Sequence, residues 1–455
     1  MISFSIEQIF VIIYFLSTLG FGFYKKSGTD VNSFLFAGRK LTVPALVATL
    51  VSTWYGGILE VGRFTYENGI VTWIIFGVFY YLAALLFVKY IAPKIVKQEI
   101  PTIPELFLTK FGQVPAIIAL FCVVLITSPA PYLKILGQLF KHVWDIPFIW
   151  ALFLGTSLSI VYALFGGFSA IVRTDKFQFI LMFLGFGVIL FYSYYNYGGL
   201  DFLLINTPQY AFSIPGNLNW EFVFVWGFIA LITFIDPSFY QRTFSGNSLK
   251  SVQKGILISI GFWIIFDFMT IFTGLYALAI LPSIESSPFL DLAEIVLPPF
   301  ARGLFIVSLF AIVASTIDSF TFISAYTLGR DLPIVLKLEI SKMDAIKHTR
   351  LGLFITIIIS IILAIYFKNA VDIWYLVGSF TTPTLLIPLL CALYEIRLKN
   401  TSLVLILPLL ASIGWHLHGV MNLGEEGFPG YLFNLDPMYP GIMLSIILFY
   451  FYKED

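Results

Sequence analysis

Residues 52–57 read Ser-Thr-Trp-Tyr-Gly-Gly, and they lie in the middle of an apolar run that covers residues 42–63. A run of about 20 apolar residues is long enough for a helix to cross the core of a bilayer. A second interruption, Thr-Phe-Ile-Asp-Pro-Ser at residues 233–238, lies inside the apolar run over residues 220–242. Unwound backbone at membrane depth is tolerated only where it lines a cavity or is buried in protein. The two interruptions therefore predict a membrane protein with a binding site built from broken helices.

The rest of the chain has the composition of a membrane protein. Of its 455 residues, 59% are hydrophobic and 11% are charged, whereas soluble domains carry about 25% charged residues. The 26 basic and 26 acidic residues balance, so the net charge gives no reason to expect nucleic acid as a partner. Two cysteines and four histidines do not form a zinc framework. Residues 4–23 lack a basic flank and a cleavage site, so we expect a retained span there.

Hydrophobic runs recur along the whole sequence and predict an all-α polytopic protein with about 13 transmembrane helices. The approximate limits of these runs are 4–23, 42–63, 70–92, 114–141, 146–166, 170–196, 220–242, 252–281, 300–328, 348–367, 371–396, 401–418 and 437–453.

Basic residues in the short connections set the expected orientation. With the N-terminus outside, most Lys and Arg residues fall on the cytoplasmic side, and the long outer segments at 197–219, 282–299 and 419–436 contain none. An odd number of spans then places the C-terminus in the cytoplasm. We expect a multi-pass protein of the plasma membrane, specifically a bacterial inner membrane.

The spans divide into a symmetric core and peripheral helices. We expect a peripheral N-terminal helix in residues 1–30, a first repeat in 31–200, a second repeat in 215–398 and two peripheral C-terminal helices in 399–455. Each repeat holds five core helices. Because five is odd, the second repeat starts on the opposite side of the membrane, which is the inverted-repeat layout of many secondary transporters.

Short motifs occur in a fixed order relative to these spans. They are Phe-Leu-Phe-Ala-Gly-Arg at 34–39, Thr-Ile-Pro-Glu at 102–105, Gly-Gly-Phe-Ser-Ala at 166–170 followed by Thr174, Asp175 and Gln178, Gln241-Arg242, and Ser315-Thr316. Over roughly residues 30–390 the chain thereby resembles the sodium:solute symporter family. The resemblance implies the fold of the bacterial leucine transporter, with a 5+5 inverted-repeat core, and alternating access driven by a sodium gradient.

The resemblance also implies a sodium site between the broken first core helix and the eighth. Carried over by position, its ligands are backbone oxygens near Leu50, Thr53 and Ile312 and the hydroxyls of Ser315 and Thr316. Oxygen ligands suit a hard cation. The alternative is that these hydroxyls bond only their own backbone or a neighbouring helix.

Asp318 departs from the small residue that the family would have there, and it lies one helical turn after Ser315. In some members a second sodium lies nearby, with an aspartate that matches Asp175. We therefore expect a possible second cation site at Asp175, Asp318 and Ser319. A proton, a cationic group of the substrate or an internal ion pair are alternatives for Asp318.

Ionisable groups inside spans are costly, at about 2.5–3.5 kcal/mol on insertion scales, so each is a candidate for function. Within the predicted spans they are Glu60, Lys134, Asp175, Asp236, Asp267 and Asp318. The substrate candidates around the two interruptions and the facing third core helix are Ser52, Trp54, Gly56, Gly57, Glu60, Tyr132, Lys134 and Asp236. Lys134 needs a partner, which is Glu60, Asp236 or a carboxylate of the substrate.

Together these features predict a secondary transporter that couples import of a small polar organic solute to sodium. We expect no cofactor and no metal beyond sodium, and partners limited to the solute, sodium and the lipid bilayer. The oligomeric state stays open, although nothing in the sequence requires more than a monomer. The solute itself is not specified.

Three other functions were weighed against sodium symport. Proton coupling through Asp175 and Asp318 is the alternative within transport. A membrane solute sensor would need an output domain, but only Lys453, Glu454 and Asp455 follow the last span. An intramembrane enzyme is not expected, because no nucleophile–base pair or set of metal ligands is found at membrane depth. The sequence also has no G-x-x-x-x-G-K-[ST] loop, so an ATP-driven pump is not expected.

Overall fold

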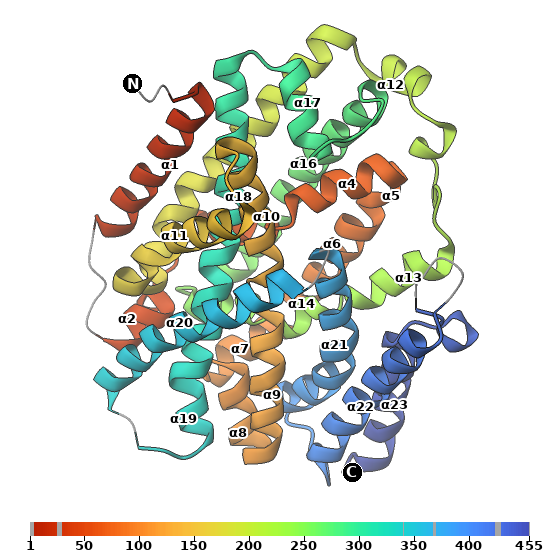
Figure 1. Ribbon diagram of the computed structural model, residues 1–455. Helices are drawn as coiled ribbons and strands as arrows, with labels where there is room; N and C mark the ends of the chain where they lie inside the picture. Colours follow the sequence, from red (N-terminus) through yellow and green to blue (C-terminus); the bar gives the residue numbers. More distant parts are fainter. Residues whose placement is uncertain (1–3, 25–29, 340, 367–369, 424–428, 455) are drawn as a thin grey trace.

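The computed structural model describes residues 4–24, 30–339, 341–366, 370–423 and 429–454, and within these ranges the chain is built of helices with only isolated β-bridges (Figure 1). The helices are α1 (Ile6–Phe23), α2 (Val31–Phe36), α3 (Val43–Trp54), α4 (Ile58–Asn68), α5 (Val71–Trp73), α6 (Phe79–Leu86), α7 (Ala92–Gln98), α8 (Ile103–Phe111), α9 (Gln113–Ile126), α10 (Ala130–Trp144), α11 (Phe148–Tyr197), α12 (Leu200–Asn206), α13 (Trp220–Ile229), α14 (Ile232–Ile235), α15 (Pro237–Ser245), α16 (Leu249–Ile280), α17 (Pro288–Val296), α18 (Pro299–Tyr326), α19 (Leu332–Val335), α20 (Lys342–Tyr366), α21 (Ala370–Tyr394), α22 (Thr401–Met421) and α23 (Met438–Tyr452).

Long apolar helices confirm the predicted class of membrane protein. Over the described ranges, 10 helices are long and apolar enough to cross a membrane, and the bent pair α3 and α4 makes up to 11. The two remaining predicted spans correspond to shorter apolar helices, Phe148–Ser157 and Met438–Tyr452. The all-helical architecture is thus confirmed, whereas the count of 13 spans is not.

The outside of the bundle carries large apolar side chains. On α20, Phe354, Ile358 and Ile362 recur every fourth residue and are 54%, 60% and 61% exposed. Soluble monomers rarely expose contiguous apolar surface of this kind, whereas a surface that faces lipid requires it. The chain is therefore a multi-pass membrane protein.

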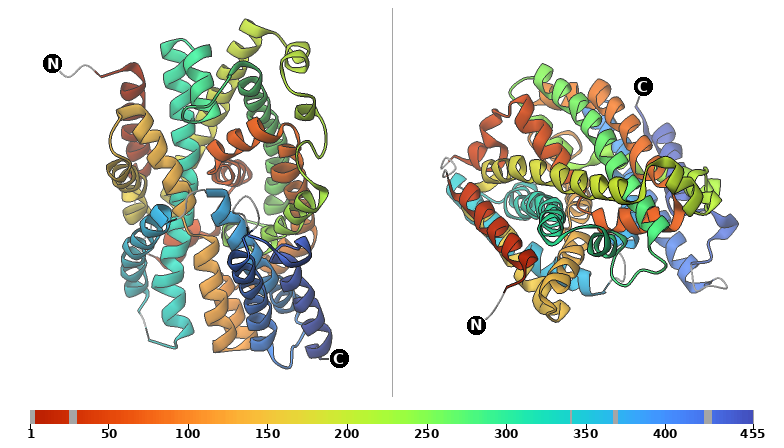
Figure 2. Two further views of the ribbon diagram at one scale, coloured as in Figure 1. Left: turned by 45° about the vertical axis from the view of Figure 1, so that its right-hand side comes forward. Right: turned by 90° about the horizontal axis from the view of Figure 1, so that it is seen from above.

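Helix α18 forms the centre of the bundle, and 83% of its most apolar segment is buried. It packs against α11 along most of its length and also touches α1, α3, α10 and α20. The view from above in Figure 2 shows α18 surrounded by other helices. Polar residues on α18 are consequently shielded from both water and lipid.

Three spans are interrupted, each at the residues that sequence chemistry indicates. Helices α3 and α4 meet at an angle of 58° across the residues that contain Gly56 and Gly57. Asp236 adopts an extended conformation between α14 and α15, where Pro237 cannot continue the hydrogen-bond ladder. Helices α9 and α10 are separated just before the first turn of α10, which contains Pro131. Breaks at the first and sixth core helices expose backbone groups at membrane depth.

The boundary predicted between the runs at 146–166 and 170–196 falls at a kink within α11. Gly167 is non-helical there, at φ 54°, and separates the two helical segments that the runs predict. Only glycine adopts this region without strain. A Cβ at Gly167 would also collide with the backbone of Phe34, so this glycine allows both the kink and the close approach of α2.

Candidate functional site

The break between α3 and α4 packs tightly against side chains of three other helices, α10, α18 and α21. A Cβ on Gly56 would lie 2.6 Å from the side chains of Thr316 and Tyr132, closer than real contacts allow. The indole ring of Trp374 lies against Gly57 and would overlap any Cβ there. The glycine pair thus brings the broken backbone into contact with both α18 and α21.

Hydroxyl and carbonyl oxygens meet where α3 ends against α18. Thr316 Oγ1 donates a hydrogen bond of 2.8 Å to the carbonyl of Thr53 and lies 3.3 Å from the carbonyl of Ile312. Ser315 Oγ lies 2.9 Å from Ser52 Oγ. Ser52, Ser315 and Thr316 are completely buried. This contact therefore gathers hard oxygen atoms from two helices in a dry environment.

A carboxylate from α11 joins the same group. Asp175 Oδ1 accepts a hydrogen bond of 2.7 Å from Ser315, and the Thr49 hydroxyl donates to Oδ2. Asp175 has no exposed surface. A buried carboxylate of this kind is stable only with a compensating positive charge or a proton.

Arg242, on α15, supplies positive charge to this group. Its Nη2 donates hydrogen bonds of 2.8 Å to both Thr53 Oγ1 and Ser319 Oγ, and one of 2.9 Å to Thr49 Oγ1. The same atom lies 4.0 Å from Asp175 Oδ2, and the side chain is 1% exposed. The guanidinium thus links α15 to α3 and α18.

The five predicted sodium ligands lie close together in the fold. Thr53, Ile312, Ser315 and Thr316 share the hydrogen bonds described above. Leu50 lies one turn before Thr53 on α3 and is 3% exposed. Among the predicted second-site residues, Asp175 and Ser319 both adjoin the guanidinium of Arg242.

Asp318 lies apart from that network. It is completely buried, and neither carboxylate oxygen has a hydrogen-bond partner among the residues that the structure describes. It interacts electrostatically with Tyr14 of α1. The Tyr14 hydroxyl accepts a hydrogen bond of 3.0 Å from Gln178 Nε2. Asp318 therefore shares no hydrogen bond with Ser315, Asp175 or Arg242 in the described part of the chain.

A cavity of about 170 Å³ lies beside the two breaks. It is bounded by Leu50, Thr53, Trp54, Tyr55, Gly57, Val61, Phe76, Tyr80, Ile126, Tyr132, Trp226, Ile229, Ile232, Asp236, Ser238, Phe239, Arg242, Asp267, Phe320, Trp374 and Val377. Because Leu50 and Thr53 belong to both this wall and the α3–α18 contact, the cavity adjoins the predicted sodium ligands.

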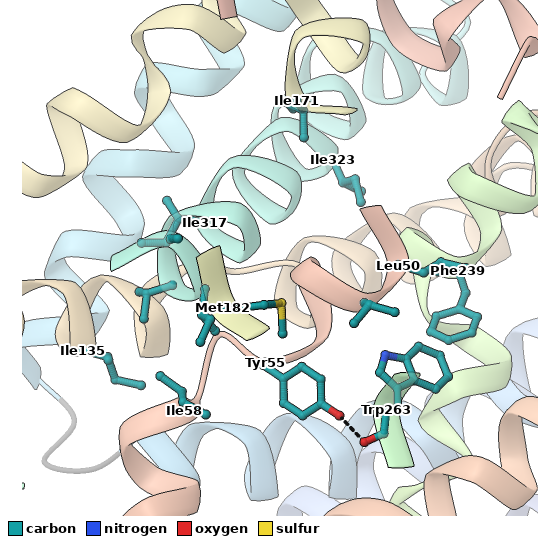
Figure 3. Packing of buried hydrophobic residues seen from close by; sticks show 14 of the residues in the cluster. Leu50, Tyr55, Ile58, Ile135, Ile171, Met182, Phe239, Trp263, Ile317 and Ile323 are labelled. Atoms are coloured by element: carbon teal, nitrogen blue, oxygen red, sulfur yellow. Dashed lines mark hydrogen bonds between the residues drawn. The ribbon is translucent and has the colours of Figure 1, made fainter. Parts of the chain in front are cut away.

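Aromatic rings form much of the cavity wall. Trp54 lies 5.2 Å from both Tyr80 and Trp263 between ring centroids. In Figure 3, Phe239 and Leu50 lie beside Trp263, whose carbonyl accepts a hydrogen bond of 3.0 Å from Tyr55. Aromatic walls of this kind suit a compact organic solute.

A second ring group also lines the cavity. The Tyr132 ring is centred 5.4 Å from Phe320 and 5.8 Å from Trp374. Since Trp374 also covers Gly57, this ring group connects α10 and α21 with the break between α3 and α4.

Two acidic residues contribute the charge of the wall. Asp236 Oδ1 accepts hydrogen bonds from the backbone N–H groups of Ser238, at 2.6 Å, and Phe239, at 3.2 Å, so it caps the N-terminus of α15. Asp267, on α16, accepts a hydrogen bond from the Tyr81 hydroxyl. These carboxylates are 8% and 6% exposed, respectively.

Four of the predicted substrate residues line the cavity: Trp54, Gly57, Tyr132 and Asp236. Two others support it from behind. Ser52 donates a hydrogen bond of 2.8 Å to the Ala48 carbonyl and lies against Ser315, and Gly56 lies against Thr316.

Glu60 and Lys134 do not belong to the cavity wall. Glu60 forms a salt bridge of 2.7 Å with Arg63, one turn later on α4. Lys134 interacts electrostatically with Glu60 and Asp372. Of the partners considered for Lys134, the fold thus places Glu60 within range.

Sequence reasoning assigned no role to three residues of the site. Arg242 appeared only within the Gln241-Arg242 motif, and Asp267 only as an ionisable group inside a span. Trp374 carried no local signal at all, because its position over Gly57 depends on how α21 packs against α4. An intramembrane charge was the one signal that could have identified Asp267.

Comparisons with known proteins agree with this architecture. The model of the sodium:solute symporter family matches residues 34–402. The sodium/proline symporter 2 of Staphylococcus saprophyticus is 23% identical, covering 98% of this chain and 92% of that protein. The sodium/pantothenate symporter of Escherichia coli K12 is also 23% identical, covering 96% and 94%.

Solved structures show the same fold. A Na⁺-coupled sialic acid symporter in a substrate-bound, outward-open state aligns with a TM-score of 0.79 at 17% identity, over 97% of this chain and 96% of that one. Mhp1, a nucleobase-cation-symport-1 transporter in a closed conformation, aligns with a TM-score of 0.60 at 11% identity, over 91% and 92%. The predicted inverted-repeat core of leucine-transporter type is confirmed.

Proposed function

The chain belongs to the sodium:solute symporter family, and from this we propose that it imports a small polar organic solute with sodium bound where α3 meets α18. It is a sodium-coupled secondary transporter and not an enzyme. The proposed sodium ligands are the backbone oxygens of Leu50, Thr53 and Ile312 and the hydroxyls of Ser315 and Thr316.

The observation that carries the sodium proposal is the contact between Thr316 Oγ1 and the Thr53 carbonyl, at 2.8 Å. Helix α3 ends at Trp54, so the carbonyl of Thr53 has no partner within its own helix. The end of a helix at which carbonyls are free carries partial negative charge and favours cations. An ion there would replace the Thr316 hydrogen as the partner of that carbonyl.

We propose that the solute binds in the adjoining cavity, with Trp54, Gly57, Tyr132 and Asp236 in contact with it. Thr53 borders both sites, so sodium bound at its carbonyl stabilises the broken helix in the geometry that the solute meets. Ser52 and Gly56 hold that geometry from behind, while Glu60 and Lys134 are proposed to act at the outer approach to the cavity.

Alternating access then follows the usual order for a symporter. Sodium and solute bind from outside, the cavity closes, and both leave to the cytoplasm. Each sodium ion moving down 100 mV supplies about 2.3 kcal/mol before any concentration gradient is added. That energy is sufficient to concentrate a neutral solute by more than tenfold.

A second cation position at Asp175, Asp318 and Ser319 also remains a proposal. Support for it differs between the residues, because Asp175 and Ser319 adjoin the Arg242 guanidinium while Asp318 has no hydrogen-bond partner among the described residues. A second ion beside Asp175 would require Arg242 to move, so we propose that the guanidinium holds this position in the structure described.

The topology is proposed from the charge pattern. We place the N-terminus outside and the C-terminus in the cytoplasm of a bacterial inner membrane, with the repeats at 31–200 and 215–398 between peripheral helices at 1–30 and 399–455. The start of α1 lies at the same end of the bundle as α12 and α17, and α23 ends at the other (Figure 1). That arrangement fits an odd number of crossings.

Thermal stability of the purified protein tests the sodium proposal. We expect sodium chloride to raise the melting temperature relative to potassium chloride, with lithium chloride between them. Equal melting temperatures in all three salts, at more than one pH, would contradict sodium binding and favour protons at Asp175 and Asp318.

A further inference from the structure

The proposed solute cavity has an excess of negative charge. Asp236 and Asp267 line it, and Asp175 lies behind it. Arg242 is the one cation on the wall, and it interacts electrostatically with both Asp175 and Asp236. Among the described residues, neither Asp236 nor Asp267 forms a salt bridge. Three carboxylates against one guanidinium leave two negative charges.

A sodium ion at the Thr53 carbonyl offsets only one of these charges. A carboxylate that stays ionised in a dry cavity needs a nearby positive charge, since burial of an isolated charge is very costly. The remaining negative charge is therefore balanced either by a proton on a carboxylate or by one more cation, and the space available, about 170 Å³, is far larger than an ion.

The positions where an anionic solute would bind are already taken. Transporters with broken helices commonly direct the N-terminus of a half-helix at an anionic group of the substrate. Here the N-terminus of α15 is capped by Asp236 itself, through N–H groups at 2.6 and 3.2 Å. The start of α4 at Gly57 is covered by the Trp374 indole. A carboxylate in the solute would face Asp236 and Asp267 instead of free donors.

The aromatic walls suit a positive charge. Faces of Trp and Tyr rings attract ammonium groups, and aromatic cages recognise quaternary ammonium ligands. Trp54, Tyr80, Tyr132 and Trp374 all line the cavity. Acidic and aromatic groups therefore surround the same space.

On these grounds, and resting on the proposed symport, we propose that the solute is a small organic cation, with its charged nitrogen between Asp236, Asp267 and the aromatic rings. Sodium, the organic cation and Arg242 together balance Asp175, Asp236 and Asp267. Import then carries the charge of both the ion and the solute into the cell, so transport responds steeply to membrane potential.

A pair of solutes of equal shape tests the role of charge without changing the protein. Choline and 3,3-dimethyl-1-butanol differ in that a quaternary nitrogen replaces a carbon. Melting temperatures of the full chain are measured in sodium chloride and in potassium chloride, with choline or with 3,3-dimethyl-1-butanol added. The same measurement is made with four separate pools of small solutes: amines from primary to quaternary, carboxylates, amino acids and polyols. We expect stabilisation by choline or by the amine pool, larger in sodium, and none by dimethylbutanol.

Two variants then locate the charge. Asp236→Asn and Asp267→Asn each weaken binding of the stabilising cation by at least tenfold, whereas Asp201→Asn, which changes an exposed carboxylate of α12, leaves it unchanged. Retained stabilisation by sodium alone shows that each variant is folded. Tightening or no change in both aspartate variants would contradict the assignment.

The outcomes also separate this inference from the proposed symport. Stabilisation by sodium with a response only to carboxylates, amino acids or polyols, or to no solute at all, overturns the organic cation and keeps the sodium site. Loss of the sodium effect itself would overturn the proposed symport, whatever the solutes do.

Discussion

Replacing Thr316 by alanine removes one hydroxyl from the contact between α3 and α18, and its effect can be worked out from the structure. In potassium the variant loses the 2.8 Å hydrogen bond to the Thr53 carbonyl, which costs about 0.5–1.5 kcal/mol. In sodium it also loses an ion ligand. Hydrogen bonds to charged groups contribute about 1.5–3 kcal/mol. If the contact between the Thr316 hydroxyl and the ion contributes the same free energy, its loss weakens sodium binding roughly 10- to 150-fold.

The expected change in stability follows from mass action. If sodium is present at about 100 times its dissociation constant, it stabilises the wild type by about 2.7 kcal/mol. A 100-fold weaker site at the same concentration contributes only about 0.4 kcal/mol. Most of the difference in melting temperature between sodium and potassium should therefore disappear in Thr316→Ala.

Thr316→Ser is the matched control. It keeps the hydroxyl and removes a methyl group, which costs about 0.8 kcal/mol in both salts. We expect it to be less stable than the wild type but to keep the full sodium effect. The reasoning is refuted if Thr316→Ala and Thr316→Ser lose the sodium effect equally, or if Thr316→Ala retains it.

Three further predictions concern the neighbouring residues. Gly56→Ala should abolish sodium-driven uptake, because its Cβ would lie 2.6 Å from Thr316 and Tyr132, whereas Gly20→Ala, with nothing within 4 Å, should transport normally; uptake into proteoliposomes compares them. Arg242→Ala should destabilise the protein by about 3–5 kcal/mol, since it leaves Asp175 buried without its partner, and adding Asp175→Asn should restore part of that loss in a double-mutant cycle on melting temperature. Asp318→Asn should leave the Hill coefficient of sodium activation unchanged, because no hydrogen bond joins Asp318 to Asp175, Ser319 or Arg242 among the described residues; a lower coefficient would return Asp318 to the second cation position.

The parts of the fold that sequence predicts well are those that depend on local chemistry. Gly56 with Gly57 and Asp236 with Pro237 interrupt apolar runs, and each interruption is a break in the structure. Apolar length gives the positions of the long apolar helices, whereas the orientation drawn from the basic residues stays a prediction. The runs at 146–166 and 170–196 are likewise separated in the structure, by the kink at Gly167 within α11.

The site is predicted less completely because its members come from distant parts of the chain. Trp54 and Asp236 lie at breaks that the sequence reveals, so both could be placed at the cavity beforehand. Asp267 and Trp374 lie in otherwise regular helices, α16 and α21, and reach the cavity only through helix packing. No periodicity or motif specifies which face of a uniformly apolar helix meets which neighbour.

Arg242 shows why counting charges within spans is not sufficient. It lies at the end of an interrupted span, where a basic residue near the cytoplasmic side fits the orientation rule and calls for no partner. The fold instead buries its guanidinium to 1% exposure beside Asp175 and hydrogen-bonds it to Thr53 and Ser319. The charge balance of the cavity, and with it the inferred charge of the solute, depends on that one placement. A residue that the orientation rule assigns to the surface thus becomes the cation against which every carboxylate of the site must be counted.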